Sequence, residues 1–109
     1  MVLDYSKISS VSVEGMRDGV GTLIIQKIVE EGRTFARITL PPHTSIGPHF
    51  HIEDEEYVVI ESGMGECLQE NEWVPLKAGM VHLNKKGEQH SIRNESSNNL
   101  VILAHIVRY

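Results

Sequence analysis

Two histidines separated by one residue, His49 and His51, have the types and spacing that point most directly to chemistry. Alternate residues of a β-strand lie on one face, about 6–7 Å apart, so two such imidazoles can chelate one metal ion. Glu56 follows His51 by five residues and is out of phase with it on a straight strand. We therefore expect the chain to turn through 52–55 and return as a second strand. This predicts a hairpin with His-x-His on one arm and the carboxylate on the other.

A third histidine, His90, begins a strand-like segment that follows a turn at 85–88. Three imidazoles and one carboxylate suit a divalent transition metal such as Mn, Fe, Co, Ni, Cu or Zn, whereas Ca and Mg prefer oxygen ligands. The residues alone leave the carboxylate open between Glu55 and Glu56. The predicted ligands are thus the three histidines and one of these two glutamates.

The elements that must position these side chains are short strands. Alternating or continuous β-branched and apolar runs, separated by Gly, Pro or polar turns, indicate about nine or ten of them. The expected strands cover 10–14, 22–30, 34–40, 45–52, 56–61, 65–69, 72–76, 80–84, 90–93 and 100–107. Because the histidines must face a shared interior, this pattern favours an all-β barrel or jelly roll with a hollow mouth over a filled sandwich.

Composition narrows the class of protein. The chain has 109 residues, which predicts one domain over 1–109, and its net charge is −5. An acidic chain without a Lys/Arg cluster argues against nucleic acid or an anionic membrane as partner. Cys67 is the single cysteine, so no intrachain disulfide can form. The sequence shows no signal peptide and no apolar run of membrane-spanning length, and we expect a cytoplasmic protein.

The spacing of these residues resembles the two sequence motifs of the cupin family. The first motif is Gly, five residues, His-x-His, three or four residues, Glu, six residues and Gly, and it matches His49, His51, Glu56 and Gly63. The second is Gly, five residues, Pro-x-Gly, two residues, His, three residues and Asn, and it matches Gly79, Gly87, His90 and Asn94. His43 and Lys85 stand where the family has Gly and Pro. Both are turn positions, so these departures concern turn stiffness rather than metal binding.

The chain thus resembles a small single-domain cupin of the cupin 2 type, similar to oxalate decarboxylase-like proteins. The resemblance implies a double-stranded β-helix (jelly-roll) barrel, the choice of Glu56 over Glu55 as ligand, and a homodimer. It also implies one divalent metal, Mn, Fe, Ni, Zn or Cu, and a small-molecule substrate. The implied reactions are those of a dioxygenase, decarboxylase or isomerase acting on a carboxylate, enediol or sugar.

The alternative is a binding or sensing module that holds metal and ligand without turnover. An apolar mouth would favour binding, whereas a mouth lined with further polar residues would favour an enzyme. A weaker third possibility is a structural metal that only staples the barrel.

The sequence also suggests roles for four other side chains. Arg37 could project into the barrel and bind a substrate carboxylate. His43 and His82 are expected to be structural or exposed, and Asn94 to hydrogen-bond within a turn.

Overall fold

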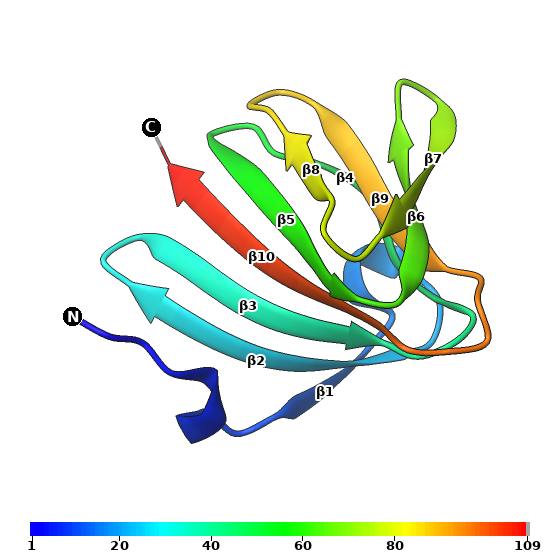
Figure 1. The fold of residues 1–109 in the computed structure, drawn as a ribbon. Helices are drawn as coiled ribbons and strands as arrows, with labels where there is room; N and C mark the ends of the chain where they lie inside the picture. Colours follow the sequence, from blue (N-terminus) through cyan, green and yellow to red (C-terminus); the bar gives the residue numbers. More distant parts are fainter. Residues whose placement is uncertain (109) are drawn as a thin grey trace.

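In a computed structural model, which describes residues 1–108, the chain is built almost entirely of β-strands (Figure 1). The strands are β1 (Val11–Glu14), β2 (Thr22–Glu30), β3 (Arg33–Leu40), β4 (Thr44–Phe50), β5 (Asp54–Ser62), β6 (Met64–Gln69), β7 (Glu72–Lys77), β8 (Val81–Asn84), β9 (Gln89–Asn94) and β10 (Leu100–Arg108). Two short 3₁₀ segments, η1 (Tyr5–Lys7) and η2 (Met16–Asp18), precede β2. Each predicted strand is confirmed to within two residues at either end.

The strands form two antiparallel sheets that face each other (Figure 1). The six-stranded sheet has the order β1-β2-β3-β10-β5-β8, and the four-stranded sheet has the order β4-β9-β6-β7. The expected all-β jelly roll is therefore confirmed. Residues 1–108 contain no helix that is long and apolar enough to cross a membrane.

The space between the sheets is filled at one end and hollow at the other. Register places Leu40 beside Leu100 at the filled end, and both side chains are 0% exposed. Aliphatic side chains from both sheets complete this core: Leu23, Ile38, Ile60, Ile92 and Ile102. Further along the six-stranded sheet the inward positions become small or polar, namely Ala36, Ala104, Thr34 and Glu56. The hollow end is where the predicted ligands lie.

The predicted hairpin between the His-x-His strand and the strand of Glu56 is wrong. β4 pairs with β9 in the four-stranded sheet, whereas β5 pairs with β10 and β8 in the other sheet. The chain after His51 therefore arches from one sheet to the other. Backbone hydrogen bonds between His51 and the turn before β9 hold the start of this arch. Glu56 reaches the histidines across the interior rather than from a neighbouring strand.

Candidate metal centre

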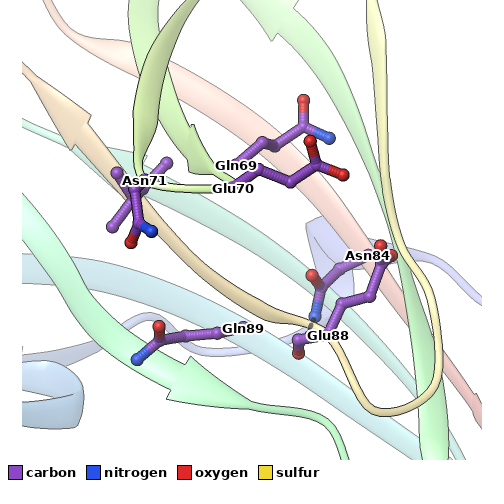
Figure 2. A pocket seen from close by; sticks show the side chains of 7 residues that line it. Gln69, Glu70, Asn71, Asn84, Glu88 and Gln89 are labelled. Carbon is purple, nitrogen blue, oxygen red and sulfur yellow. Dashed lines mark hydrogen bonds between the residues drawn. The ribbon is translucent and has the colours of Figure 1, made fainter.

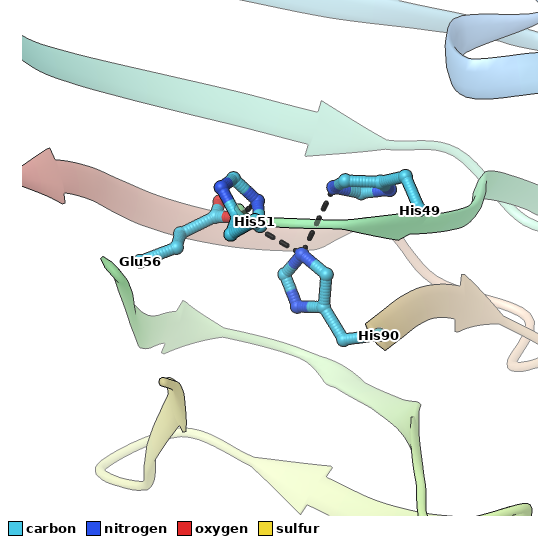
Figure 3. A group of neighbouring side chains, drawn as sticks. All are labelled: His49, His51, Glu56 and His90. Atoms are coloured by element: carbon cyan, nitrogen blue, oxygen red, sulfur yellow. Dashed lines mark hydrogen bonds and ion pairs between the residues drawn. The ribbon is translucent and has the colours of Figure 1, made fainter. Parts of the chain in front are cut away.

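The side chains of His49, His51, Glu56 and His90 converge at the hollow end of the barrel (Figure 3). One donor atom from each lies within 4.8 Å of all the others. Nε2 of His90 is 3.0 Å from Nε2 of His49 and 3.0 Å from Oε1 of Glu56, which in turn lies 2.9 Å from Nε2 of His51. Among residues 1–108 this is the one group of three or more metal-binding side chains.

The geometry of these donors fits a metal ion. An octahedral ion with bonds of about 2.1 Å places adjacent ligands about 3.0 Å apart. Nε2 of His51 is buried and has no hydrogen-bond partner of acceptable geometry among the described residues, although Glu56 is close. The Nε2 atoms of His49 and His90 face each other at 3.0 Å, and both present lone pairs when each Nδ1 carries the proton. A divalent cation would satisfy all these atoms at once.

The other ring nitrogen of each histidine is already engaged. Nδ1 of His49 lies 2.7 Å from the carbonyl oxygen of Gly47, and Nδ1 of His51 lies 2.7 Å from Oδ1 of Asp54. Nδ1 of His90 lies 3.0 Å from Nε2 of His82. A histidine that donates from Nδ1 keeps its proton there and leaves the Nε2 lone pair free. His49 and His51 are therefore held in the tautomer that a metal needs, and His90 takes the same tautomer when His82 accepts its Nδ1 proton.

An irregularity in β4 aims His49 inward. Ile46 pairs with Ile92 and His49 pairs with His90, so β4 has one more residue than β9 between the two pairs. Three residues of a regular strand would put Ile46 and His49 on opposite faces, and this bulge restores the same face. Gly47-Pro48 is the sequence that forms it, since strand prolines occur at bulges and edges. Simple alternation along a straight strand does not predict this bulge.

The structure shows which of the two neighbouring glutamates, Glu55 or Glu56, joins the cluster. Glu56 is buried among the histidines, whereas Glu55 accepts a hydrogen bond from the hydroxyl of Tyr57 at 2.9 Å. Alternation along β5 explains the difference, because Glu56 shares its face with Val58 and Ile60 of the core. Glu56 is thus the carboxylate that joins the cluster.

The electrostatics of the cluster favour the charged carboxylate. In the metal-free cluster, burial raises the pKa of Glu56, but its close contacts with the His51 and His90 rings in their protonated form outweigh burial and lower that pKa to about 2. The same contact with Glu56 raises the pKa of His51, despite burial. Burial lowers the pKa of His49, and the nearby charges of His90 and Arg17 add to this effect.

The cluster lines a cavity of about 50 Å³ that adjoins a larger chamber of about 630 Å³. Five residues line both: Met16, Arg17, Ile38, Glu56 and Ile106. The remaining walls of the chamber are mostly aliphatic side chains of β1, β2, β3 and β10. Arg17 lines both spaces, and its positive charge acts on His49. Ligand could therefore reach the metal-binding atoms through an apolar mouth that carries positive charge.

Comparison with known proteins decides the family. The Cupin domain family model matches residues 36–106, which include all four converging side chains. This chain is a cupin. It is 34% identical over 113 residues to an oxalate-binding protein of Thermotoga maritima, covering 98% of this chain and 93% of that one.

Solved structures agree with the cupin fold. A predicted oxalate decarboxylase from Thermotoga maritima superposes with a TM-score of 0.93 at 34% identity, covering 100% of both chains. A sugar phosphate isomerase of the cupin superfamily from Silicibacter pomeroyi superposes with a TM-score of 0.81 at 17% identity, covering 100% of this chain and 76% of that one. The second similarity concerns the fold alone.

In this cupin, a close backbone contact holds Arg17 beside the cluster. Gly19 and Gly47 pack η2 against β4, and a Cβ on Gly47 would overlap the carbonyl oxygen of Arg17. Ser45 reinforces this contact, since its hydroxyl accepts from the backbone N–H of Val20 at 2.9 Å. The sequence indicated turns near these glycines but gave no sign of this contact.

Gly47→Ala should destabilise the cupin by about 1–3 kcal/mol, because the added methyl group meets backbone that cannot rotate away. The measurement is the urea midpoint of unfolding by circular dichroism. Pro48→Ala, at the exposed neighbour in the same bulge, should cost less than about 1 kcal/mol. Equal midpoints for Gly47→Ala and wild type would contradict the close contact.

The sequence did not place His82 beside the cluster. His82 was expected to be structural or exposed, and it is buried, 4% exposed, and bonded to the ligand candidate His90. Burial, followed by the charge of His90, lowers the pKa of His82 to about 4, so its imidazole is neutral at pH 7 and can accept the His90 proton. Its alternation with Asn84 on β8, both buried, is the pattern that could have revealed it.

His82→Leu should weaken metal binding by about ten- to a hundredfold, because Nδ1–H of His90 loses its buried acceptor. His82→Gln should recover part of the affinity, because its amide oxygen can accept the same proton. Isothermal titration of the metal-free protein with Zn²⁺ measures both. Unchanged affinity in His82→Leu would remove this role.

Two other expectations change. Arg37 faces outward on β3 and forms an ion pair with Glu61 at 2.9 Å, so the hypothesis that it binds substrate inside the barrel is wrong. Its neighbours Ala36 and Ile38 take the inward positions instead. Asp54, which lies in the stretch 52–55 that was expected to be a turn between two arms of one hairpin, orients His51.

A polar hollow of about 280 Å³ lies away from the cluster, between the β6–β7 and β8–β9 turns (Figure 2). Asn84 Nδ2 donates to the carbonyl oxygen of Glu88 at 3.2 Å, and the Glu88 carboxylate accepts from the backbone N–H of Lys85 at 2.7 Å. These bonds shape the turn that leads into His90. The residues that line this hollow thus include those that fix the turn before β9.

Proposed function

We propose that this cupin binds one divalent transition-metal ion, Mn, Fe, Ni, Zn or Cu, through His49, His51, Glu56 and His90, and uses it to hold a small chelating carboxylate. The observation that carries the proposal is the convergence of three free Nε2 atoms and one carboxylate while every Nδ1 is engaged. The oxalate-binding relative from Thermotoga maritima supports a carboxylate as the ligand. Arg17, at the junction with the chamber, would add charge attraction for it.

The mouth favours binding over turnover. Its walls are mostly aliphatic, which is the feature expected of a binding module. A metal bound here would supply positive charge and open coordination positions for two ligand oxygens. The surrounding side chains would exclude water and orient the carboxylate. Catalysis by a dioxygenase, decarboxylase or isomerase reaction is the second candidate, since four protein donors leave part of an octahedral ion open.

The test begins with protein purified anaerobically without an affinity tag, whose metal content is measured by mass spectrometry. Oxalate is then titrated into the Mn²⁺-loaded and the metal-stripped protein, with acetate as a non-chelating control. We expect oxalate to bind only the loaded protein, and acetate to bind neither form measurably. Equal oxalate binding by the stripped protein would contradict the proposal. Oxygen uptake or carbon dioxide release from oxalate would show that the protein catalyses a reaction of oxalate rather than only binding it.

Metal affinity should fall as the pH falls. His51 must lose its proton to bind a metal, and its pKa lies above the ordinary 6.5 because of Glu56. Below that pKa each pH unit should weaken binding by about tenfold, since one proton competes with the ion. Zn²⁺ titrations from pH 8 downward, in two buffers of different ionisation enthalpy, measure both the slope and the proton released. A flat profile around pH 6.5 would contradict the pairing of His51 with Glu56.

The partners we propose are a small-molecule ligand and a second copy of the chain. β1 forms one edge of the six-stranded sheet and pairs on one side with β2, so its other edge could receive a partner strand. We propose no nucleic acid or membrane partner, from the acidic charge of the chain, and a cytoplasmic location, from its single cysteine. Sedimentation of the purified protein tests the homodimer.

A further inference from the structure

The chamber beside the metal centre is larger than a ligand as small as oxalate requires. Its volume of about 630 Å³ lies in the range of sites for larger organic ligands, about 300–1,000 Å³. Two small side chains, Ala36 and Ala104, form its floor on β3 and β10. A leucine at either position would fill much of this space. The sequence therefore leaves room for a ligand that extends past the metal.

A lysine stands at the far side of this floor. One row of paired residues crosses four strands, from Lys27 through Ala36 and Ala104 to Val58. Lys27 shares the inward face of β2 with the buried Ile25, and both line the chamber. Lys27 forms no ion pair with any of residues 1–108, although the protein carries a net charge of −5. Lys27 is an exposed residue of the chamber wall, so its ammonium group is available to an anion that reaches this side of the chamber.

The register also sets the distance from this lysine to the metal centre. Glu56 lies two residues beyond Val58 on the same face of β5. Three strand spacings and two residues put the Cα atoms of Lys27 and Glu56 roughly 16 Å apart. Strand side chains stand roughly perpendicular to the sheet, so Lys27 and Glu56 close only part of this distance. The carboxyl carbons of oxalate are bonded directly to each other, so oxalate cannot span this gap.

We infer that Lys27 binds a second acid group of the ligand, and that the ligand is a 2-hydroxy or 2-oxo dicarboxylate with a short aliphatic spacer. This inference rests on the proposed function. The oxygen-bearing end chelates the metal, the spacer lies on Ala36 and Ala104, and the distal carboxylate pairs with Lys27. The aliphatic walls match the spacer, and the two cations at the junction and the far side match a dianion.

The test compares 2-hydroxyglutarate with 2-hydroxypentanoate, which has a methyl group in place of the distal carboxylate. Both are titrated into Mn²⁺-loaded wild type, Lys27→Met and Lys77→Met, with oxalate as a short reference. We expect wild type and Lys77→Met to prefer the dicarboxylate by about tenfold, and Lys27→Met to show less than about twofold preference. Ala36→Leu should weaken both hydroxy acids by at least about tenfold and leave oxalate within about threefold.

The outcomes separate the two proposals. Equal binding of the two hydroxy acids by wild type, or a preference that survives in Lys27→Met, overturns the inference while metal-dependent oxalate binding upholds the proposed function. Loaded protein that binds neither oxalate nor the hydroxy acids overturns both.

Discussion

His51→Ala should purify with less than about a tenth of the wild-type metal and bind added Zn²⁺ at least about a hundredfold more weakly. The variant removes one of three imidazole donors and leaves the buried carboxylate of Glu56 without its closest partner. The loaded wild type should also gain stability that the variant cannot, about 4 kcal/mol when free metal exceeds the dissociation constant a thousandfold. Mass spectrometry of metal content and thermal unfolding with and without Zn²⁺ measure these effects.

His105→Ala is the matched control, because it also removes an imidazole but from the outer face of β10. The ring of His105 packs against Phe35 with centroids 5.3 Å apart and is not one of the converging residues. It should keep the wild-type metal content. Metal retained by a folded His51→Ala variant would show that the four side chains do not act as one site.

Asn94→Ala should destabilise the protein by about 2–3 kcal/mol without changing the metal stoichiometry. The Asn94 side chain is 0% exposed and donates to the carbonyl oxygens of Leu40 and Asn98 at 2.8 and 2.7 Å. Its Oδ1 accepts from the backbone N–H and the hydroxyl of Ser96. Alanine leaves a buried carbonyl oxygen and the loop after β9 without these bonds. Urea unfolding monitored by circular dichroism gives the free-energy difference.

Asn98→Ala controls for the change of residue type, because the exposed Asn98 contributes its backbone oxygen to this network and not its side chain. It should unfold within about 0.5 kcal/mol of wild type. A similar loss in both variants would show that the loop tolerates neither change, and would remove the special role of Asn94. The prediction that Asn94 hydrogen-bonds within a turn is confirmed by these contacts.

Local patterns were sufficient to predict the strands and the three converging histidines. Strand ends followed Gly, Pro and polar turns, and His49, His51 and His90 were identified by spacing. The choice of Glu56 needed the family spacing, because Glu55 and Glu56 are chemically alike and only the phase of β5 separates them. Phase depends on which face meets the core, and a single run of residues does not contain that information.

Long-range pairing was beyond the sequence. Alternation shows which residues share a face, but it does not say which sheet a strand joins, so β4 and β5 were wrongly placed in one hairpin. The inward position of Arg37 was wrong because alternation does not say which of the two faces of a strand meets the core. His82 and Arg17 matter through contacts with residues distant in the chain or on another strand, His90 and Gly47, and neither forms a motif.

The arch after His51 gives a bound ion a mechanical role. Three donors come from the β4–β9 side and Glu56 comes from β5 in the other sheet, so the ion would act as a removable cross-link between the two layers. At the opposite end the layers are joined by aliphatic packing and by the hydrogen bond from Asn94 to the carbonyl oxygen of Leu40. Metal loss should therefore let the layers part first at the hollow end, with faster amide exchange in β4 and the start of β5 than around Leu40 and Leu100. The barrel would then open at the hollow end while the aliphatic core at the other end keeps the two sheets together.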